Sequence, residues 1–190
     1  MAATAAQQQS AASSKTITWE EFKKRYLTRE DTWKYEWVDG TVEKTPRSMD
    51  TTQFYIFVNL LEFLNRLRPA TTTGGGTFIA EGDAFFSGNH RRPDIAFYSM
   101  KQIRDGRENK DVHPDFVIEV ISKNDQMLKV QDKMGDYRKA GVKVIWHIFP
   151  KQQEIHVYHG KKMTVCIGDD ICSAEPVIEG FVIAAKDVFK

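Results

Sequence analysis

The sequence predicts a mixed α/β fold in which helices flank a central mixed β-sheet. Residues 115–149 have the pattern of a strand, a helix of about three turns and a second strand. A connection of that kind places its two strands parallel. This second strand is the first of three consecutive strand-like runs between residues 142 and 168.

The N-terminal part divides into a tail and the start of the fold. Residues 1–16 are rich in Ala, Gln and Ser, so we expect a disordered tail and a single domain over residues 17–190. Thr18 followed by Glu21 forms a capping-box pattern, which predicts a short helix through Tyr26. Alternating residues on both sides of Asp39-Gly40 predict a β-hairpin.

The middle of the chain predicts one long helix and then several short strands. Large apolar residues recur every three or four positions between residues 52 and 68, which indicates an amphipathic helix with a stripe of Phe54, Phe57, Val58, Leu61, Leu64 and Leu67. Strand-like runs follow at residues 77–82, 83–87, 93–98 and 114–122, with a polar stretch at 101–113. The last two runs are apolar on both faces, which is typical of central strands. Residues 180–189 predict a final strand and a short helix.

Composition excludes several classes of protein. The chain has 190 residues, of which 41% are apolar, and its 27 basic and 26 acidic side chains give a net charge of +1. This near neutrality argues against non-specific coating of nucleic acid. The chain has neither an apolar run of membrane-spanning length nor a secretory signal, so we expect a cytoplasmic protein without membrane contact. Two cysteines, Cys166 and Cys172, are too few for a disulfide framework, and we expect reduced thiols.

Glu119 is the sole charged residue inside the apolar strand of residues 116–121. Burying a carboxylate without a partner costs several kcal/mol, so a cation or donor should lie beside it, or the acid should be protonated. A metal ion or a lysine would serve. The alternative is an ordinary structural ion pair inside the core.

Asp94 begins the neighbouring strand-like run and is the second candidate. Carboxylates at the ends of adjacent strands offer the hard oxygen ligands that Mg²⁺ prefers, although Asp94 is equally suited to capping a loop. Lys133 flanks the apolar stripe of the helix that follows Glu119, and Lys129 lies one turn earlier. A lysine in such a position is commonly solvated, and it becomes a candidate here because of the two acids.

The two acids, the lysine and this order of elements resemble the PD-(D/E)XK restriction-endonuclease-like superfamily, and more closely its Uma-type family of bacterial endonucleases. The matching stretches span nearly the whole folded chain and are YEWVDGTV, RRPDIAFY, PDFVIEVIS, KMGDYRKAGVKVIWHIFP, EIHVY and EGFVIAAKDVF. The superfamily pattern has a lysine where this chain has Ile121. The resemblance implies that the lysine has moved to the following helix, at Lys133, with Lys129 the weaker candidate.

The resemblance implies a restriction-endonuclease-like fold and Mg²⁺-dependent hydrolysis of phosphodiester bonds in DNA, with Mn²⁺ as a substitute cation. Asp94, Glu119 and the backbone carbonyl of Val120 would then hold the metal, while Lys133 orients the attacking water. Glu36 matches another acidic family position and would bind metal through water or position Lys133, unless it is simply an exposed hairpin carboxylate. A homodimer, which suits cutting both strands, is also implied.

Three further points bear on function. The family often carries a His at the start of the long helix, where this chain has Thr52 or Gln53, so any proton transfer by that His is lost or moved.

His147 is expected to be a hydrogen-bonded strand histidine. A basic stretch offers phosphate contacts or, with its interleaved acids, a solvated face; it contains Arg91, Arg92, Lys101, Arg104, Arg107 and Lys110.

Two other functions stay open at this point. One is a catalytically silent module of the same fold that binds nucleic acid or protein. The other is hydrolysis of a different phosphoester, because these residues describe phosphoryl chemistry and not the bases of a substrate.

Overall fold

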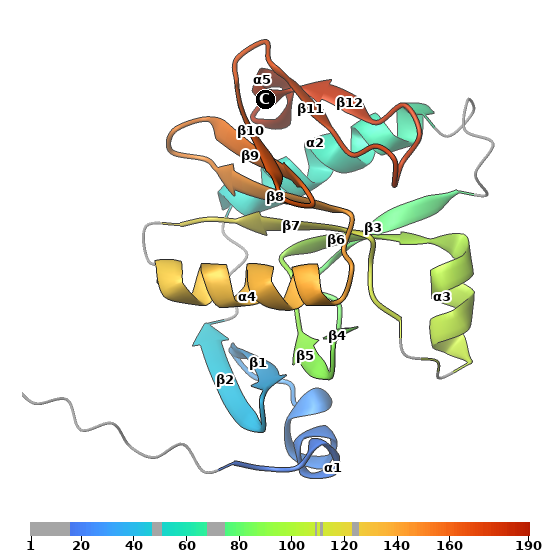
Figure 1. Ribbon diagram of the computed structural model, residues 1–190, viewed down its shortest axis with the longest axis vertical. Coiled ribbons are helices and arrows are strands. Elements are labelled where there is room, and N and C mark those ends of the chain that lie inside the picture. Colours follow the sequence, from blue (N-terminus) through green and yellow to red (C-terminus); the bar gives the residue numbers. More distant parts are fainter. Residues whose placement is uncertain (1–15, 47–50, 68–74, 109, 111, 123–125) are drawn as a thin grey trace, which may run out of the picture.

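A six-stranded mixed sheet is the centre of the computed structural model, which describes residues 16–46, 51–67, 75–108, 110, 112–122 and 126–190 (Figure 1). The strand order is β10-β9-β8-β7-β6-β3. All neighbouring pairs are antiparallel except β7 and β8, which are parallel. The strands are β3 (Gly76–Ala80), β6 (Ile95–Ser99), β7 (Phe116–Val120), β8 (Val144–Phe149), β9 (Glu154–His159) and β10 (Lys162–Ile167).

The predicted strand-helix-strand unit is confirmed as β7, α4 (Met127–Lys139) and β8. Every residue of β7 is buried, as its apolar sequence predicts for a strand covered on both faces. Because α4 connects two parallel strands, it lies across one face of the sheet (Figure 1).

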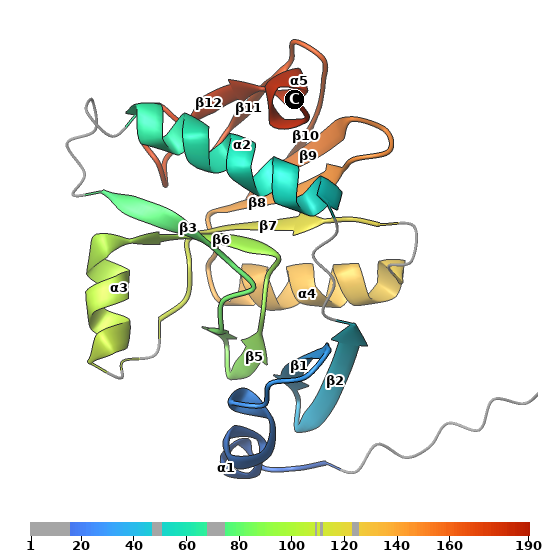
Figure 2. The same ribbon diagram turned by 180° about the vertical axis from the view of Figure 1, so that it is seen from behind.

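The opposite face of the sheet is covered by α2 (Thr51–Leu67) and, at the C-terminal end, by α5 (Ala185–Val188) with the hairpin of β11 (Ile171–Ser173) and β12 (Val182–Ala184) (Figure 2). The predicted helical stripe was partly wrong. The buried positions of α2 are Ile56, Leu60 and Leu64, whereas Phe54 is 57% exposed. The helix is apolar on more than one side, and the i, i+4 row at 56, 60 and 64 is the one that packs on the sheet.

A second sheet lies on the far side of α4, in the order β2-β1-β5-β4. Its strands are β1 (Trp33–Val38), β2 (Thr41–Pro46), β4 (Ala84–Phe86) and β5 (Asn89–Arg91), and α1 (Trp19–Phe22) with the π-helical turn η1 (Lys23–Leu27) lies beside them. The predicted hairpin is confirmed, since Asp39 and Gly40 have φ of 46° and 81° in its turn. The Thr18 hydroxyl caps α1 by accepting the Glu21 N–H.

The polar stretch at residues 101–113 contains a helix that the sequence analysis did not predict, α3 (Met100–Arg107). Its apolar content is too low for a periodic stripe, and the helix begins instead at a capping box between Ser99 and Gln102. The short strand β5 was also missed.

The two cysteines, the N-terminal tail and the character of the helices were also the subject of predictions. Cys166 and Cys172 are free and buried, as expected. The predicted tail lies outside the described residues except for Thr16. None of the described helices combines the length and apolar character needed to cross a membrane.

Candidate active site

Asp94 and Glu119 occupy neighbouring positions across the β6–β7 ladder. The antiparallel register pairs Ile95 with Ile118 and Ala96 with Val117, so the next step places Asp94 opposite Glu119. Residues opposite one another project from the same face of a sheet. For both acids this is the face that α4 covers, because Val117 and Tyr137 pack together there. The fold thus brings together the two acids that the sequence singled out.

Glu119 has partners for both carboxylate oxygens. Its Oε2 lies 3.2 Å from Lys133 Nζ, and its Oε1 accepts a hydrogen bond from the Tyr137 hydroxyl. Burial raises the pKa of Glu119 and the nearby charge of Asp94 adds to this rise, against the opposing effect of Lys133. The compensating partner that the sequence analysis required is therefore a lysine, assisted by a tyrosine one helical turn away.

Asp94 is held between two donors. Its Oδ2 accepts the backbone N–H of Val120 at 2.9 Å, and its Oδ1 lies 3.1 Å from the ammonium group of Lys34 on β1. The predicted alternative of a loop cap is thus replaced by a contact between strands, because Asp94 fixes the end of β7 and not its own loop.

Glu36 lies on β1 and is 2% exposed, so its alternative as an exposed hairpin carboxylate was wrong. Its Oε1 lies 3.6 Å from Lys133 Nζ and accepts the Arg92 N–H at 2.7 Å. Burial alone would raise the pKa of Glu36, but Lys133, Lys34 and Arg91 outweigh burial and lower it to about 2. Glu36 is therefore an ionised contact between β1 and the lysine of α4.

We call these five side chains the acid–lysine cluster: Lys34, Glu36, Asp94, Glu119 and Lys133. They come from both sheets and from α4, so the cluster exists only when these three elements pack together. Lys133 contacts two carboxylates, and these together with Asp94 outweigh burial and raise its pKa. Lys129 is exposed on the same helix, which places it away from the cluster.

Arg91 contacts one member of the cluster, Glu36, and two further acids. Its guanidinium is 1% exposed and pairs with Glu36, Glu43 and Asp136 at 3.3, 3.0 and 2.8 Å. Asn89 donates to the same Asp136 carboxylate at 3.1 Å. Both alternatives that the sequence left open for Arg91, a phosphate contact and a solvated face, were therefore wrong, because this side chain is enclosed by acids.

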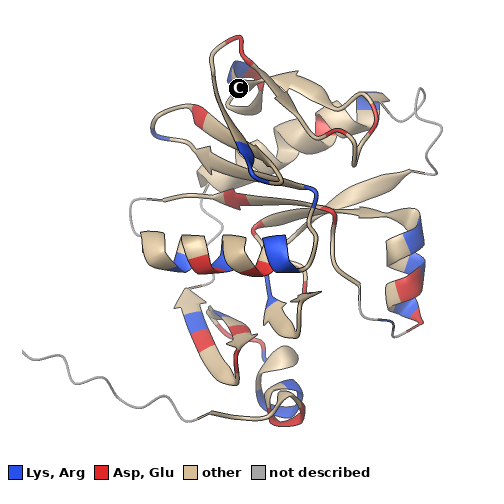
Figure 3. Cartoon of the chain, viewed as in Figure 1, with Lys and Arg blue, Asp and Glu red and all other residues tan. Residues whose placement is uncertain are grey.

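The rest of that basic stretch does not form a single positive surface. Lys101 and Lys110 both pair with Asp105, and Figure 3 shows basic and acidic positions interleaved along α3. Among the described residues, this favours the solvated face over the phosphate contacts.

Two residues of the cluster and its surroundings were missed although the sequence holds a signal for each. Lys34 is two positions from Glu36 on one strand, so both side chains share a face. Tyr137 is four positions from Lys133, so both lie on one side of α4. If Glu36 and Lys133 face the interior, Lys34 and Tyr137 are expected to face it as well.

The donor types of the cluster suit a Mg²⁺ ion. Asp94 and Glu119 supply carboxylate oxygens. The Val120 N–H points to the edge of β7 where Asp94 lies, whereas the next N–H, that of Ile121, donates to β8. Because the N–H and C=O of one strand residue point to the same edge, the Val120 carbonyl also faces Asp94. Within the described part of the chain no group of three or more His, Cys, Asp or Glu side chains has the arrangement of a metal site. Water would have to supply most of the ligands, as is usual for Mg²⁺.

His147 lies next to Glu119 on the neighbouring strand β8. It is 3% exposed, and its Nε2 has no hydrogen-bond partner among the described residues. The expectation of a hydrogen-bonded histidine was therefore wrong for this atom. Burial lowers the pKa of His147 to about 4, and the charges of His156, Arg138 and Lys133 act in the same direction.

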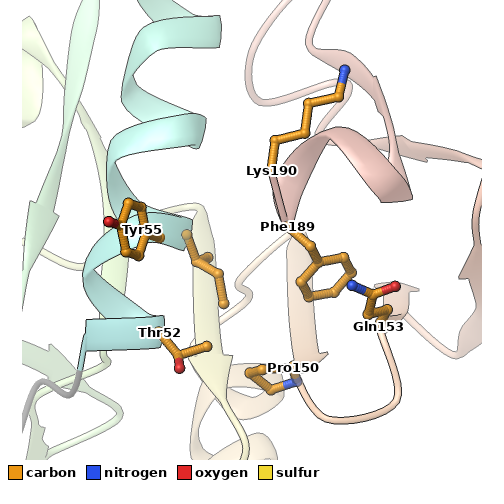
Figure 4. Close-up of a pocket in the computed structure, with 7 residues that line it drawn as sticks. Thr52, Tyr55, Pro150, Gln153, Phe189 and Lys190 are labelled. Carbon is orange, nitrogen blue, oxygen red and sulfur yellow. The ribbon is translucent and has the colours of Figure 1, made fainter.

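A cavity of about 300 Å³ lies between the start of α2, the β8–β9 turn and the C-terminus (Figure 4). Thr52, one of the two residues at the family's His position, lines it together with Tyr55 and Phe189. None of its lining residues belongs to the acid–lysine cluster. We therefore assign it no part in the chemistry of that cluster.

Comparisons with known proteins bear on the family and the fold. A family model described as "Uma2: Putative restriction endonuclease" matches residues 19–186. Among solved structures, the fold is similar to the crystal structure of "a putative nuclease belonging to DUF820 from Anabaena variabilis ATCC 29413". The TM-score is 0.74 at 22% sequence identity, over 91% of this chain and 97% of that chain. No curated protein matches the chain.

Proposed function

Because this chain belongs to the Uma2 family of restriction-endonuclease-like proteins, we propose that it is a Mg²⁺-dependent endonuclease that hydrolyses phosphodiester bonds in DNA. The family's description supports a nuclease-like function, and the restriction-endonuclease-like mixed α/β fold agrees with it. The observation that carries the proposal is the convergence of Asp94, Glu119 and Lys133 in one cluster.

In this proposal Asp94, Glu119 and the Val120 carbonyl hold the cation. When bound, Mg²⁺ supplies charge to polarise the phosphate and to acidify a water molecule. Lys133 orients the attacking water and stabilises the negative charge that develops on the phosphate. Glu36 keeps the Lys133 ammonium in place through the contact at 3.6 Å.

A specific observation favours a second candidate, a catalytically silent binding module. Asp94 and Glu119 each already have a lysine ammonium within 3.2 Å. Such pairs satisfy buried carboxylates without a metal, so the same five residues would also serve a purely structural role. The experiment below separates the two candidates.

Cleavage of supercoiled plasmid with Mg²⁺, with Mn²⁺ and with a chelator tests the proposal. We expect nicking that requires the cation and is lost in Glu119→Gln and in Lys133→Ala. The matched control is Lys129→Ala, which removes an exposed lysine from the same helix and should leave nicking unchanged. No nicking by the wild type under these conditions, together with no cation binding, would favour the silent module.

The proposal includes a homodimer, in which two sites would act on the two strands of a duplex. Sedimentation equilibrium of the full chain measures this directly. A monomer at the concentrations used for cleavage would remove the dimer from the proposal and leave the chemistry of each site unaffected.

A further inference from the structure

Lys34 is the member of the acid–lysine cluster for which neither the Asp and Glu-X-Lys pattern nor the proposed mechanism supplies a role. The residue is 7% exposed, which is unusual for a lysine. Its ammonium lies 3.1 Å from Asp94 Oδ1, on a strand that belongs to the other sheet. This buried lysine extends from the small sheet to a single carboxylate at the edge of the large sheet, which packing alone does not explain.

The two lysines of the cluster are held differently. Lys133 is within 4 Å of two carboxylates, those of Glu119 and Glu36. For Lys34, the described part of the chain offers a single carboxylate at ion-pair distance, that of Asp94. Lys133 thus keeps a partner if Glu119 turns to another cation, whereas Lys34 loses its direct partner if Asp94 does.

The position of Lys34 matters because its partner, Asp94 Oδ1, is the oxygen of that carboxylate whose donor is a side chain and not the backbone. Asp94 Oδ2 is already fixed by the Val120 N–H, which belongs to the backbone and cannot move away without opening the end of β7. Lys34 is a side chain with four rotatable bonds, so it is able to leave. A cation that binds Asp94 Oδ1 therefore has to displace the Lys34 ammonium.

Charge argues in the same direction. The Lys34 ammonium lies 3.1 Å from the Asp94 carboxylate, which stabilises its charged form. The ammonium therefore stays charged and repels any divalent cation that approaches Asp94. Its attraction to the carboxylate and its repulsion of the incoming ion both weaken cation binding.

We propose that Lys34 is the internal counterion of Asp94, which holds this carboxylate in place without metal and is displaced when a divalent cation binds. This inference rests on the proposed function, since it concerns the same cation site. It assigns Lys34 a positioning role that sets the affinity of the site. Removal of the lysine charge should therefore tighten cation binding, the opposite of what damage to the site would do.

Isothermal titration of the full chain with Mn²⁺ alone, in the absence of DNA, tests the proposal. In Lys34→Met the methionine keeps the unbranched apolar stem and removes the charge, and we expect Mn²⁺ to bind about tenfold more tightly than to the wild type. Lys34→Arg keeps the charge and should bind as the wild type does. Lys129→Met is the matched control on the exposed side of α4 and should change nothing.

A thermal melt of the same proteins guards against misfolding. Lys34→Met leaves Asp94 without its lysine counterion, so the melting midpoint of the variant without cation should fall below that of the wild type. The increase of this midpoint on addition of Mn²⁺ should be larger than for the wild type. A lower midpoint with no larger rise would mean that Lys34 is only structural.

The outcomes separate this inference from the proposed function. Equal or weaker Mn²⁺ binding by Lys34→Met, with clear binding by the wild type, overturns the counterion role and leaves the cation site standing. Binding by Lys34→Met alone supports the counterion role in its strongest form. Absence of binding by every variant overturns both.

Discussion

The guanidinium of Arg91 on β5 donates to Asp136 on α4 at 2.8 Å and so ties the small sheet to the helix that carries Lys133. The same guanidinium pairs with Glu36, which contacts Lys133 from β1. One buried cation therefore fixes the distance between the hairpin and the helix, and the acid–lysine cluster depends on it although Arg91 does not contact Lys133.

Replacement of Arg91 by Met should lower the free energy of unfolding by about 3 to 5 kcal/mol, because Glu36 and Asp136 would lose their buried cation. Urea unfolding followed by circular dichroism measures the change. Arg66→Met provides the control, since that side chain is 75% exposed and pairs at the surface with Glu62. A loss of less than about 1 kcal/mol in Arg91→Met would show that the network adds little to folding.

Removal of the Tyr137 hydroxyl should destabilise the protein with little loss of packing. In Tyr137→Phe the ring still contacts Phe86, with centroids 4.6 Å apart, but Glu119 Oε1 loses its donor. An unsatisfied buried acceptor costs about 1 to 3 kcal/mol, which urea unfolding will resolve.

Tyr98→Phe is the matched control for that experiment. Tyr98 is also buried, but its hydroxyl makes a longer contact of 3.4 Å with the Asp83 carbonyl. We expect a smaller change there, and an equal change in both variants would contradict a special contribution of the hydroxyl to Glu119.

Two glycine-to-alanine substitutions should shift stability in opposite directions. At Gly76 on β3 a Cβ would lie 2.3 Å from Phe97 Cζ and 2.5 Å from the Tyr98 carbonyl oxygen, so Gly76→Ala should destabilise by about 1 to 3 kcal/mol. At Gly135 inside α4 a Cβ meets nothing within 4 Å, so Gly135→Ala should stabilise by about 0.5 to 1 kcal/mol. Thermal melts of both variants test the pair, and a shared sign would contradict the argument.

The parts of the fold that depend on local pattern were predicted well. Asp39-Gly40 identified its hairpin because both turn residues adopt positive φ, and the apolar run around Glu119 identified the central strand. Helix α3 was missed because its helical signal is a cap and not an apolar stripe. The buried face of α2 was assigned incorrectly because a helix with apolar residues on several sides does not reveal which side meets the sheet.

Individual residues of the candidate site were identified from the sequence, whereas most contacts between them were not. Glu119 was identifiable because a lone charge in an apolar strand requires a partner, and Lys133 matched a family pattern. Arg91 was misjudged because its sequence neighbours are polar, while its burial depends on acids from β1, β2 and α4. Contacts between segments so far apart in the chain leave no local signal. Lys34 differs, because its position on the same face of β1 as Glu36 is a local signal, and only its contact with Asp94 has none.

Acidification should destabilise the protein through His147. Its pKa is about 4 in the folded protein against an ordinary value of 6.5, because burial disfavours the imidazolium. Above pH 6.5 the imidazole is neutral in both the folded and the unfolded state and contributes no pH dependence. Below 6.5 the unfolded chain takes up a proton that the folded protein excludes, so stability falls until the pH passes the folded pKa.

Between pH 7.5 and pH 4.5 this linkage amounts to about 2 to 3 kcal/mol in the free energy of unfolding. His147→Gln places a side chain that does not titrate at the same strand position, so it should lose less stability than the wild type over this range by about that amount. Urea unfolding of both proteins at the two pH values gives the difference. Equal losses in the two proteins would mean that groups other than His147 govern acid stability in this range. The expected difference would show that the uncharged state of the imidazole beside Glu119 is maintained by burial, because water cannot reach the Nε2 that lacks a partner.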